Sequence, residues 1–281
     1  MDNLLEKSSY NSRNKRTVKF SLDCSDVSPD TRRWLSVIKK ISESPGSGIL
    51  EGFVVSLTKK IVVKFQNATN SLKEYRTSLI LFDTGISNFI KYYCNFTCTD
   101  DVKKFINMKA PEYICKGDEE MVGYIIMPIY KEGSISGYGW KSSKILILKS
   151  LVKQTILALA SAFIRTGFVH EDLHIGNILM RKTKKTDIKY PILDLSVSTV
   201  GMYAIIMDFE RSNFSGNMET FKRSMRKLFG CLRSPGETSY ILIDNSKLIR
   251  GLSNFDSVNK KNITSLLKLV DNMEIAGEIS S

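Results

Sequence analysis

The sequence predicts an α+β protein in two parts: a β-rich first part with one key helix, and a mostly helical second part. Apolar, β-branched runs concentrate before residue 130, whereas the longest stretch with helical spacing, Lys144 to Arg165, follows it. The Gly- and Ser-rich segment Lys131 to Tyr138 between them is typical of a connector. We therefore expect a flexible basic tail at 1–16, one domain at 17–130 and a second at 131–281.

The composition is that of a folded chain with an excess of positive charge. In 281 residues, Lys and Arg number 41 and Asp and Glu 29, a net charge of +12, and 42% of residues are hydrophobic. These values exclude a disordered, collagen-like or disulfide-dense chain. The charge fits anionic partners such as nucleotides, nucleic acid or acidic proteins, but solubility alone also accounts for it. With only two histidines, the chain has no three-histidine metal site.

The cysteines and the apolar runs bear on location. The five cysteines are odd in number, scattered and without a complete zinc-binding pattern, so we expect reduced thiols in a cytosol-like compartment. The longest apolar run, Thr155 to Ile164, is too short to span a bilayer. The acidic N-terminal residues do not form a secretory signal. We expect a cytoplasmic protein that is not secreted and has no membrane span.

The elements of the first part follow from local signals. A cap, a proline and an acid in succession predict a short helix through Trp34 to Val37. A run of turn residues, Ser42 to Gly48, leads into a predicted strand at Ile49 to Leu57. A second strand, Ile61 to Phe65, has Lys64 inside an apolar run, where a lysine is costly unless it is paired.

Helical spacing and short apolar runs define the later elements. Residues 71–82 have helical spacing, with Glu74 beside the apolar face. The helix from Lys144 to Arg165 is expected to end at Gly167. The remaining predicted elements are strands at Tyr124 to Ile129 and Tyr203 to Met207 and a helix at 219–232.

The loop from His170 to Asn177 holds both histidines and admits two interpretations. The first is a zinc hydrolase, because His170, Glu171 and His174 fit His-Glu-x-x-His, with Glu171 as general base. That motif requires a helix, but Gly176 follows closely, and the third zinc ligand would have to be a carboxylate.

The second interpretation is phosphoryl transfer. His170, Asp172 and Asn177 have the spacing His-x-Asp-x-x-x-x-Asn. The run FVHEDLHIGNIL at 168–179 resembles the catalytic loop of the protein-kinase-like superfamily, in particular atypical protein kinases and aminoglycoside phosphotransferases. The order of elements over residues 38–230 is also similar to that of kinases. The resemblance implies a two-lobed kinase-like fold with a β-rich N-lobe and a reduced, mostly helical C-lobe.

The same resemblance assigns catalytic and metal-binding roles. Asp172 would accept the proton of the acceptor hydroxyl, and Asn177 and Asp208 would hold Mg²⁺, with Mn²⁺ as an alternative. Lys64 would bind the phosphates of ATP, and Glu74 would pair with that lysine.

Further residues are assigned to the nucleotide. His174 would lie near the transferred phosphate. Ser47 and Gly48 would present backbone N–H groups to the phosphates, and the backbone from Met127 to Ile129 would bind adenine.

The chain departs from the kinase pattern in three places. Glu171 stands where many regulated kinases have an arginine that binds a phosphorylated loop. Residues 182–200 are an insertion that we expect to loop out. The segment 222–233 carries Lys222, Arg223, Arg226, Lys227 and Arg233 without an acid among them, which fits an acidic substrate, nucleic acid or a solvated face.

The sequence thus predicts a minimal serine/threonine-protein kinase that uses Mg-ATP on a protein substrate, for which an acidic protein fits the charge. The composition resembles that of kinases of large DNA viruses, which implies a viral protein in the host cytoplasm or virion. The alternatives are a small-molecule kinase, a pseudokinase that serves as a binding module, and the zinc hydrolase.

Overall fold

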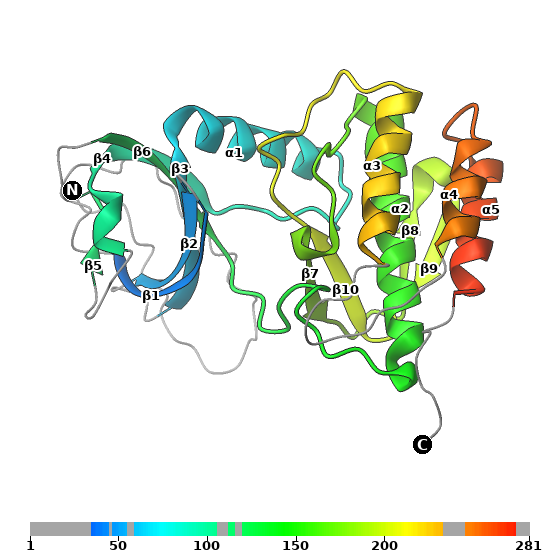
Figure 1. Cartoon of the computed structure of the whole chain (residues 1–281), viewed down its shortest axis with the longest axis horizontal. Helices are drawn as coiled ribbons and strands as arrows, with labels where there is room; N and C mark the ends of the chain where they lie inside the picture. The colour runs from blue at the N-terminus through cyan, green and yellow to red at the C-terminus, as the bar shows by residue number, and fades with distance from the viewer. Residues whose placement is uncertain are drawn as a thin grey trace, which may run out of the picture. The chain divides into compact units, whose positions relative to one another are not determined.

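The computed structural model describes residues 35–44, 47–54, 59–105, 112–115, 120–232 and 245–273. They form two compact units (Figure 1). The first contains the described residues up to Leu72 and those from Tyr92 to Ile129, and the second contains Lys73 to Lys91 and the described residues from Tyr130 on. Helices and antiparallel strands together confirm the α+β class. The predicted tail at 1–16 lies outside the described residues.

The first unit is built on a six-stranded antiparallel sheet with the order β4-β6-β3-β2-β1-β5 (Figure 1). Its strands are β1 (Leu35–Ser44), β2 (Ser47–Val54), β3 (Lys59–Asn67), β4 (Cys94–Asp100), β5 (Glu112–Tyr113) and β6 (Glu120–Met127). A 3₁₀ turn, η3 (Val102–Phe105), follows β4. Residues 35–37 belong to β1, so the helix predicted through Trp34 to Val37 is wrong over its described part. Val37 pairs with Gly52 and is fully buried, so pairing and burial override the local helix signal.

Alternation along β3 separates a hydrophobic face from the face that carries Lys64. Ile61, Val63 and Phe65 point into a core cluster with residues of β4 and β6. Because side chains alternate along a strand, Lys64 lies on the opposite face with Val62 and Gln66. All three are buried as well, so both faces of β3 are covered.

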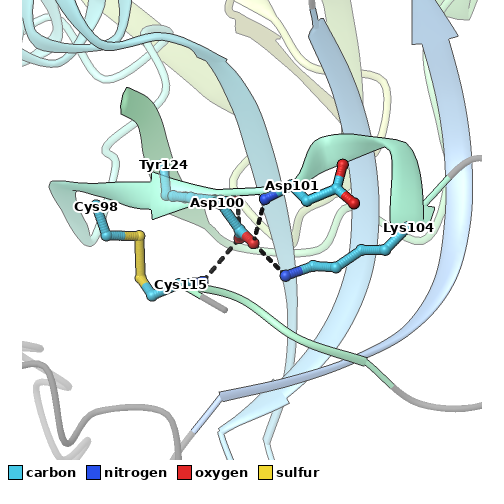
Figure 2. Close-up of a disulfide and its surroundings, with 6 residues drawn as sticks. All are labelled: Cys98, Asp100, Asp101, Lys104, Cys115 and Tyr124. Atoms are coloured by element: carbon cyan, nitrogen blue, oxygen red, sulfur yellow. Dashed lines mark hydrogen bonds and ion pairs between the residues drawn. A yellow bond between two sulfur atoms is a disulfide. The ribbon is translucent and has the colours of Figure 1, made fainter. Parts of the chain in front are cut away.

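A disulfide joins the two edges of this sheet (Figure 2). Cys98 lies in the edge strand β4, and Cys115 follows the opposite edge strand β5, with 5.4 Å between their Cα atoms. Next to it, the fully buried carboxylate of Asp100 accepts a 2.7 Å hydrogen bond from the backbone N–H of Cys115. Lys104 and the hydroxyl of Tyr124 also donate to Asp100. The sheet is therefore closed on itself by a covalent bond and a buried hydrogen-bonded charge.

This disulfide corrects the expectation of reduced thiols. Cys98 and Cys115 are bonded, and Cys94 is disulfide-bonded as well, whereas Cys231 is free. Spacing along the chain did not reveal the pair, because only the closed sheet brings the two edge strands together. The argument for a cytosol-like compartment from reduced cysteines therefore loses its basis, since disulfides persist mainly in oxidising surroundings.

The second unit is arranged around one long helix. Its elements are most of α1 (Ala68–Asp83), α2 (Ile145–Thr166), β7 (Ile178–Lys182), β8 (Asp187–Tyr190), β9 (Leu195–Ser198), β10 (Met202–Ile206), α3 (Met218–Cys231), α4 (Ser246–Ser253) and α5 (Lys260–Asp271). Helix α2 contacts β10 and α5, and α4 contacts both α3 and α5 (Figure 1). The predicted helices at 71–82, 144–165 and 219–232 and the strand at 203–207 are confirmed within a few residues.

Buried polar side chains connect distant segments of this unit. Gln154 of α2 donates to the carbonyl of Met202 at 2.8 Å and accepts from the N–H of Ala204 at 2.8 Å. Asn88 donates to the carbonyl of Ala204, and the hydroxyl of Tyr190 donates to Asn88, both at 2.8 Å. This network ties residues 73–91 to the second unit, although the sequence analysis assigned them to the first domain.

The insertion at 182–200 is ordered. It contains the antiparallel pair β8–β9, and β8 and β9 both contact α2. Tyr190 at the end of β8 is buried and reaches the carbonyl of Gln154 at 3.2 Å. The segment does not loop out as expected, because its apolar side chains have a helix to pack against.

Helix α2 also bears on the prediction of no membrane span. As formed, it is 22 residues long and is long and apolar enough to cross a membrane by length and composition. Only its ten most apolar residues form an uninterrupted run in the sequence, so the expectation that no segment is long enough to span a bilayer is wrong on length. Most of the helix is buried inside the second unit, as the core helix of a globular unit would be.

The closure of the sheet predicts a loss of stability when the disulfide is removed. The double variant Cys98→Ser/Cys115→Ser frees a loop with a sequence separation of 17 residues. Its free energy of unfolding should fall by about 3 kcal/mol, measured by urea titration without reductant. The matched control is Cys231→Ser, which removes a free thiol. Equal midpoints for the double variant and the control would contradict this account.

The end of α2 predicts a second effect on stability. Gly167 has φ of 70°, and a Cβ there would lie 2.7 Å from the carbonyl oxygen of Phe214. Gly167→Ala should therefore lower the free energy of unfolding by roughly 1 to 3 kcal/mol. Gly230→Ala is the control, because Gly230 lies within α3 with no atom within 4 Å of a new Cβ. That variant should gain about 0.5 to 1 kcal/mol in thermal or urea unfolding.

Candidate active site

The loop from His170 to Asn177 belongs to the second unit and is not an α-helix. It leaves the C-terminal end of α2 and leads into β7 through a short 3₁₀ turn, η5 (Ile175–Asn177). The backbone of Val169, just before the loop, exchanges two hydrogen bonds with Asn213, at 2.9 and 3.1 Å. Both ends of the loop are therefore fixed to regular structure.

His170 fixes the loop through its buried ring. Its ring is fully buried, and its Nε2 lies 2.8 Å from the carbonyl oxygen of Met207, which can only accept. The ring packs edge to face against Phe168 and Phe209, with centroids 6.3 and 5.8 Å away. Burial lowers the pKa of His170, although the bond to Met207 and the charge of Asp208 act in the opposite direction. The neutral imidazole thus donates from Nε2 to Met207.

The backbone of Met207 brings three predicted site residues to one junction. Its N–H donates to the carbonyl of Asn177 at 3.0 Å, while its carbonyl accepts from His170. The side chain of Asn177 is buried and donates from Nδ2 to the carbonyl of Asp172 at 3.1 Å. Asp208 follows Met207 directly. The structure therefore brings Asp172, Asn177 and the residue before Asp208 together, as the motif spacing predicts.

Two residues at this junction have a backbone conformation that side chains disfavour. Asp208 has φ of 68° and Glu171 has φ of 35°, and neither is glycine. Such strain persists only where the surroundings enforce it, and it concentrates at functional sites. Here it occurs beside the predicted base, Asp172, and at the predicted metal ligand itself.

His174 has a structural task in the loop. It caps the turn η5, and its Nδ1 accepts a 3.1 Å hydrogen bond from the N–H of Gly176. A Cβ on Gly176 would lie 2.8 Å from the His174 ring, so glycine allows this close approach.

The zinc interpretation of the loop is wrong in its structural requirement. The stretch His170 to His174 does not form the helix that would place both imidazoles on one face. Nε2 of His170 bonds to Met207 and Nδ1 of His174 bonds to Gly176. Among the described residues, no group of three or more His, Cys, Asp or Glu side chains is arranged to hold a metal.

The predicted nucleotide-binding residues of the first unit lie on neighbouring strands. Lys64 of β3 faces Ile49 of β2 on one side and Ile125 of β6 on the other, and it is only 9% exposed. Gly48 of β2 pairs with Phe65, so Ser47 and Gly48 lie within two positions of Lys64 across the ladder.

The remaining predicted nucleotide-binding residues lie in β6 and directly after it. Met127 pairs with Val62 and is buried, and Ile129 follows after the strand has ended. Lys64, Gly48 and Met127 thus come from three adjacent strands of one sheet.

Glu74 is a fully buried carboxylate on α1, in the part of that helix that belongs to the second unit. Neither Glu74 nor Lys64 is without a partner. Burial of a charged side chain is costly unless the charge is paired. Neither Lys64 nor Glu74 is therefore simply a charge on a solvated surface.

The donor set at Asn177 and Asp208 fits magnesium chemically. An amide oxygen and a carboxylate are hard oxygen ligands, which Mg²⁺ prefers. Because Nδ2 of Asn177 is used by the carbonyl of Asp172, its Oδ1 is the atom left for a cation.

Three cations around the loop were not assigned to the site from sequence. Arg223 of α3 lies 3.1 Å from the carboxylate of Glu171, and Lys227 lies 3.4 Å from that of Asp172. Arg211 lies 3.8 Å from the other oxygen of Asp172. The basic helix at 219–232 was the only signal for Arg223 and Lys227, and its spacing alone did not indicate which face meets the loop; nothing in the sequence pointed to Arg211.

Comparison with known proteins adds no assignment: no family model matches the chain, and no curated protein matches it either.

The burial of His170 predicts a pH-dependent stability. Its pKa is lowered in the folded state, so below about pH 6.5 the unfolded chain binds a proton that the folded chain does not. Stability should therefore fall as the pH drops through this range, by at most about 1.4 kcal/mol per pH unit from this group. His170→Gln should flatten the fall measured by urea unfolding, and the control His174→Gln should keep it. A fall unchanged in His170→Gln would contradict the assignment.

Proposed function

We propose that the chain is an ATP-dependent phosphotransferase, a serine/threonine-protein kinase that uses Mg-ATP. The observation that carries the proposal is the junction at Met207, whose two backbone hydrogen bonds go to Asn177 and His170. Asn177 in turn donates to the carbonyl of Asp172, and Asp208 directly follows Met207. Asp172, Asn177 and Asp208 are the three oxygen-bearing side chains that phosphoryl transfer needs for its acceptor and its metal. The proposal includes the two-lobed kinase-like fold, which the order of elements along the chain supports.

In this proposal Asp172 is the general base. The acceptor oxygen forms a bond to the γ-phosphorus, the bond from that phosphorus to the bridging oxygen of ADP breaks, and the hydroxyl proton passes to Asp172. The side chain of Asp172 is one-third exposed, so an acceptor can reach it from solvent. Asn177 and Asp208 would hold Mg²⁺, which would supply positive charge to neutralise the phosphates.

The residues of the first unit are assigned to the nucleotide. Lys64 would bind the phosphates, and its burial favours a role for the ammonium beyond that of a surface charge. Glu74 would hold that lysine, which agrees with a carboxylate that is buried and partnered. Backbone groups of Ser47 and Gly48 and of Met127 to Ile129 would bind phosphate and adenine.

The remaining expectations stay part of the proposal. The acceptor is a protein, and the cations around Asp172 favour acidic residues beside its hydroxyl. A small-molecule acceptor is the second candidate, because the loop also resembles that of aminoglycoside phosphotransferases. Location in the host cytoplasm or virion remains a prediction.

Transfer of label from γ-labelled ATP tests the proposal. We expect the wild-type chain to phosphorylate a protein acceptor in the presence of Mg²⁺, and Asp172→Asn to lower the rate by about 100-fold or more, because the amide cannot accept the proton. The matched control is Asp187→Asn, an exposed aspartate of β8.

The outcomes separate the alternatives. Equal transfer by wild type and Asp172→Asn would contradict the role of the base. No turnover of ATP with any protein or metabolite acceptor would favour the pseudokinase. Transfer only to small hydroxyl compounds would favour the small-molecule kinase.

A further inference from the structure

The carboxylate of Asp172 faces two cations from outside its own loop. Nζ of Lys227 lies 3.4 Å from Oδ1, and Nη1 of Arg211 lies 3.8 Å from Oδ2. Lys227 also donates a hydrogen bond to the carbonyl of Glu171. The Lys227 side chain is 44% exposed, so the ammonium is at once next to the predicted base and open to solvent.

Helix α3 fixes the position of this lysine. A capping box of Asn217 and Thr220 starts the helix, and its apolar face is buried. Arg223, one turn before Lys227, lies 3.1 Å from Glu171, so a single face of α3 contacts the loop through two cations. Other cations of the helix are used elsewhere: Arg226 pairs with Glu219, and Lys222 donates to the carbonyl of Ser253.

The residue that the resemblance assigns to the transferred phosphate makes a hydrogen bond within the loop itself. His174 accepts a hydrogen bond from the N–H of Gly176 through Nδ1. Phosphoryl transfer depends on positive charge, because negative charge spreads over the oxygens of the moving group. Beyond Mg²⁺ and Lys64, helix α3 brings a further positive charge close to Asp172 through Lys227.

We propose that Lys227 supplies this charge by binding the phosphoryl group as it passes to the acceptor. The inference rests on the proposed kinase function and adds a catalytic residue that the sequence motifs do not contain. A partly exposed ion pair at 3.4 Å is weak, so the ammonium can leave Asp172 for a phosphate oxygen at little cost. Its flexible four-carbon stem allows the small movement that this requires.

Three substitutions of Lys227 separate charge from structure. Lys227→Gln can still donate to the carbonyl of Glu171 but has no charge, Lys227→Met has neither property, and Lys227→Arg keeps both. We expect the Gln and Met variants to lower kcat by about 10- to 100-fold with a much smaller change in the KM for ATP, and the Arg variant to retain most of kcat. Lys222→Met, on the same helix but bonded to Ser253, should behave like wild type.

Each other outcome overturns the inference. A kcat within twofold of wild type in both Lys227→Gln and Lys227→Met would exclude a role for this ammonium. Activity in the Gln and Arg variants but not in Met would make Lys227 a structural support of the loop. Loss of kcat in Arg211→Met with normal Lys227 variants would assign the charge to Arg211. If Lys227→Met does not fold by thermal melting, the comparison of Gln with Arg decides.

Failure of this inference differs from failure of the proposed function. If wild type transfers phosphate, Asp172→Asn does not, and the Lys227 variants are normal, only the role of Lys227 falls. If wild type transfers no phosphate, the kinase function and the role of Lys227 fall together.

Discussion

The arrangement of the candidate site depends on the backbone of Met207. Strands β7 and β10 pair with Ile178 opposite Ile206, and the hydrogen bond from Met207 to the carbonyl of Asn177 continues this ladder by one step beyond both strands. The carbonyl of Met207 then accepts a hydrogen bond from Nε2 of His170. One residue of strand-like backbone thus connects the loop that carries Asp172 to the turn that carries Asp208. Positive φ at Asp208 follows from this connection, since the chain must turn away directly after it.

Buried polar groups have the same task in both units: each joins segments that are remote in sequence. Asp100 accepts hydrogen bonds from Cys115, Lys104 and Tyr124, which come from three surrounding segments. Together with the adjacent Cys98–Cys115 disulfide, it closes the sheet of the first unit. Gln154 and Asn88 attach β10 and the segment after α1 to α2 in the second unit. A buried carboxylate or amide without such donors would cost several kcal/mol, so these groups specify which segments meet.

Much of the fold and part of the site could be predicted from the sequence, and the rest could not for physical reasons. Local periodicity correctly predicted the helices at 71–82 and 144–165 and the strand around Lys64. The helix at 71–82 nevertheless buries Ser71, Glu74 and Ser78, whereas its apolar Leu72, Leu79 and Phe82 are exposed. Motif spacing singled out Asp172 and Asn177, and the side chain of Asn177 donates to the backbone carbonyl of Asp172. The Cys98–Cys115 bond, the ordered pair β8–β9 and the strand at Val37 depend on long-range pairing, which no local pattern encodes.

The charge of α3 belongs to this second class. From sequence, a run of cations without acids is typical of a solvated face, but helix geometry divides it into faces with different partners. Arg223 and Lys227 are one turn apart and meet an acidic pair, Glu171 and Asp172, in the loop. Glu171 stands where the resemblance leads one to expect an arginine, and its negative charge is matched by the positive charge of the helix that faces it. Glu171, the departure from the kinase pattern in the loop, thus has its partner in Arg223 of the basic helix. The same helix also gives Asp172 a cationic neighbour, Lys227, that the loop itself does not provide.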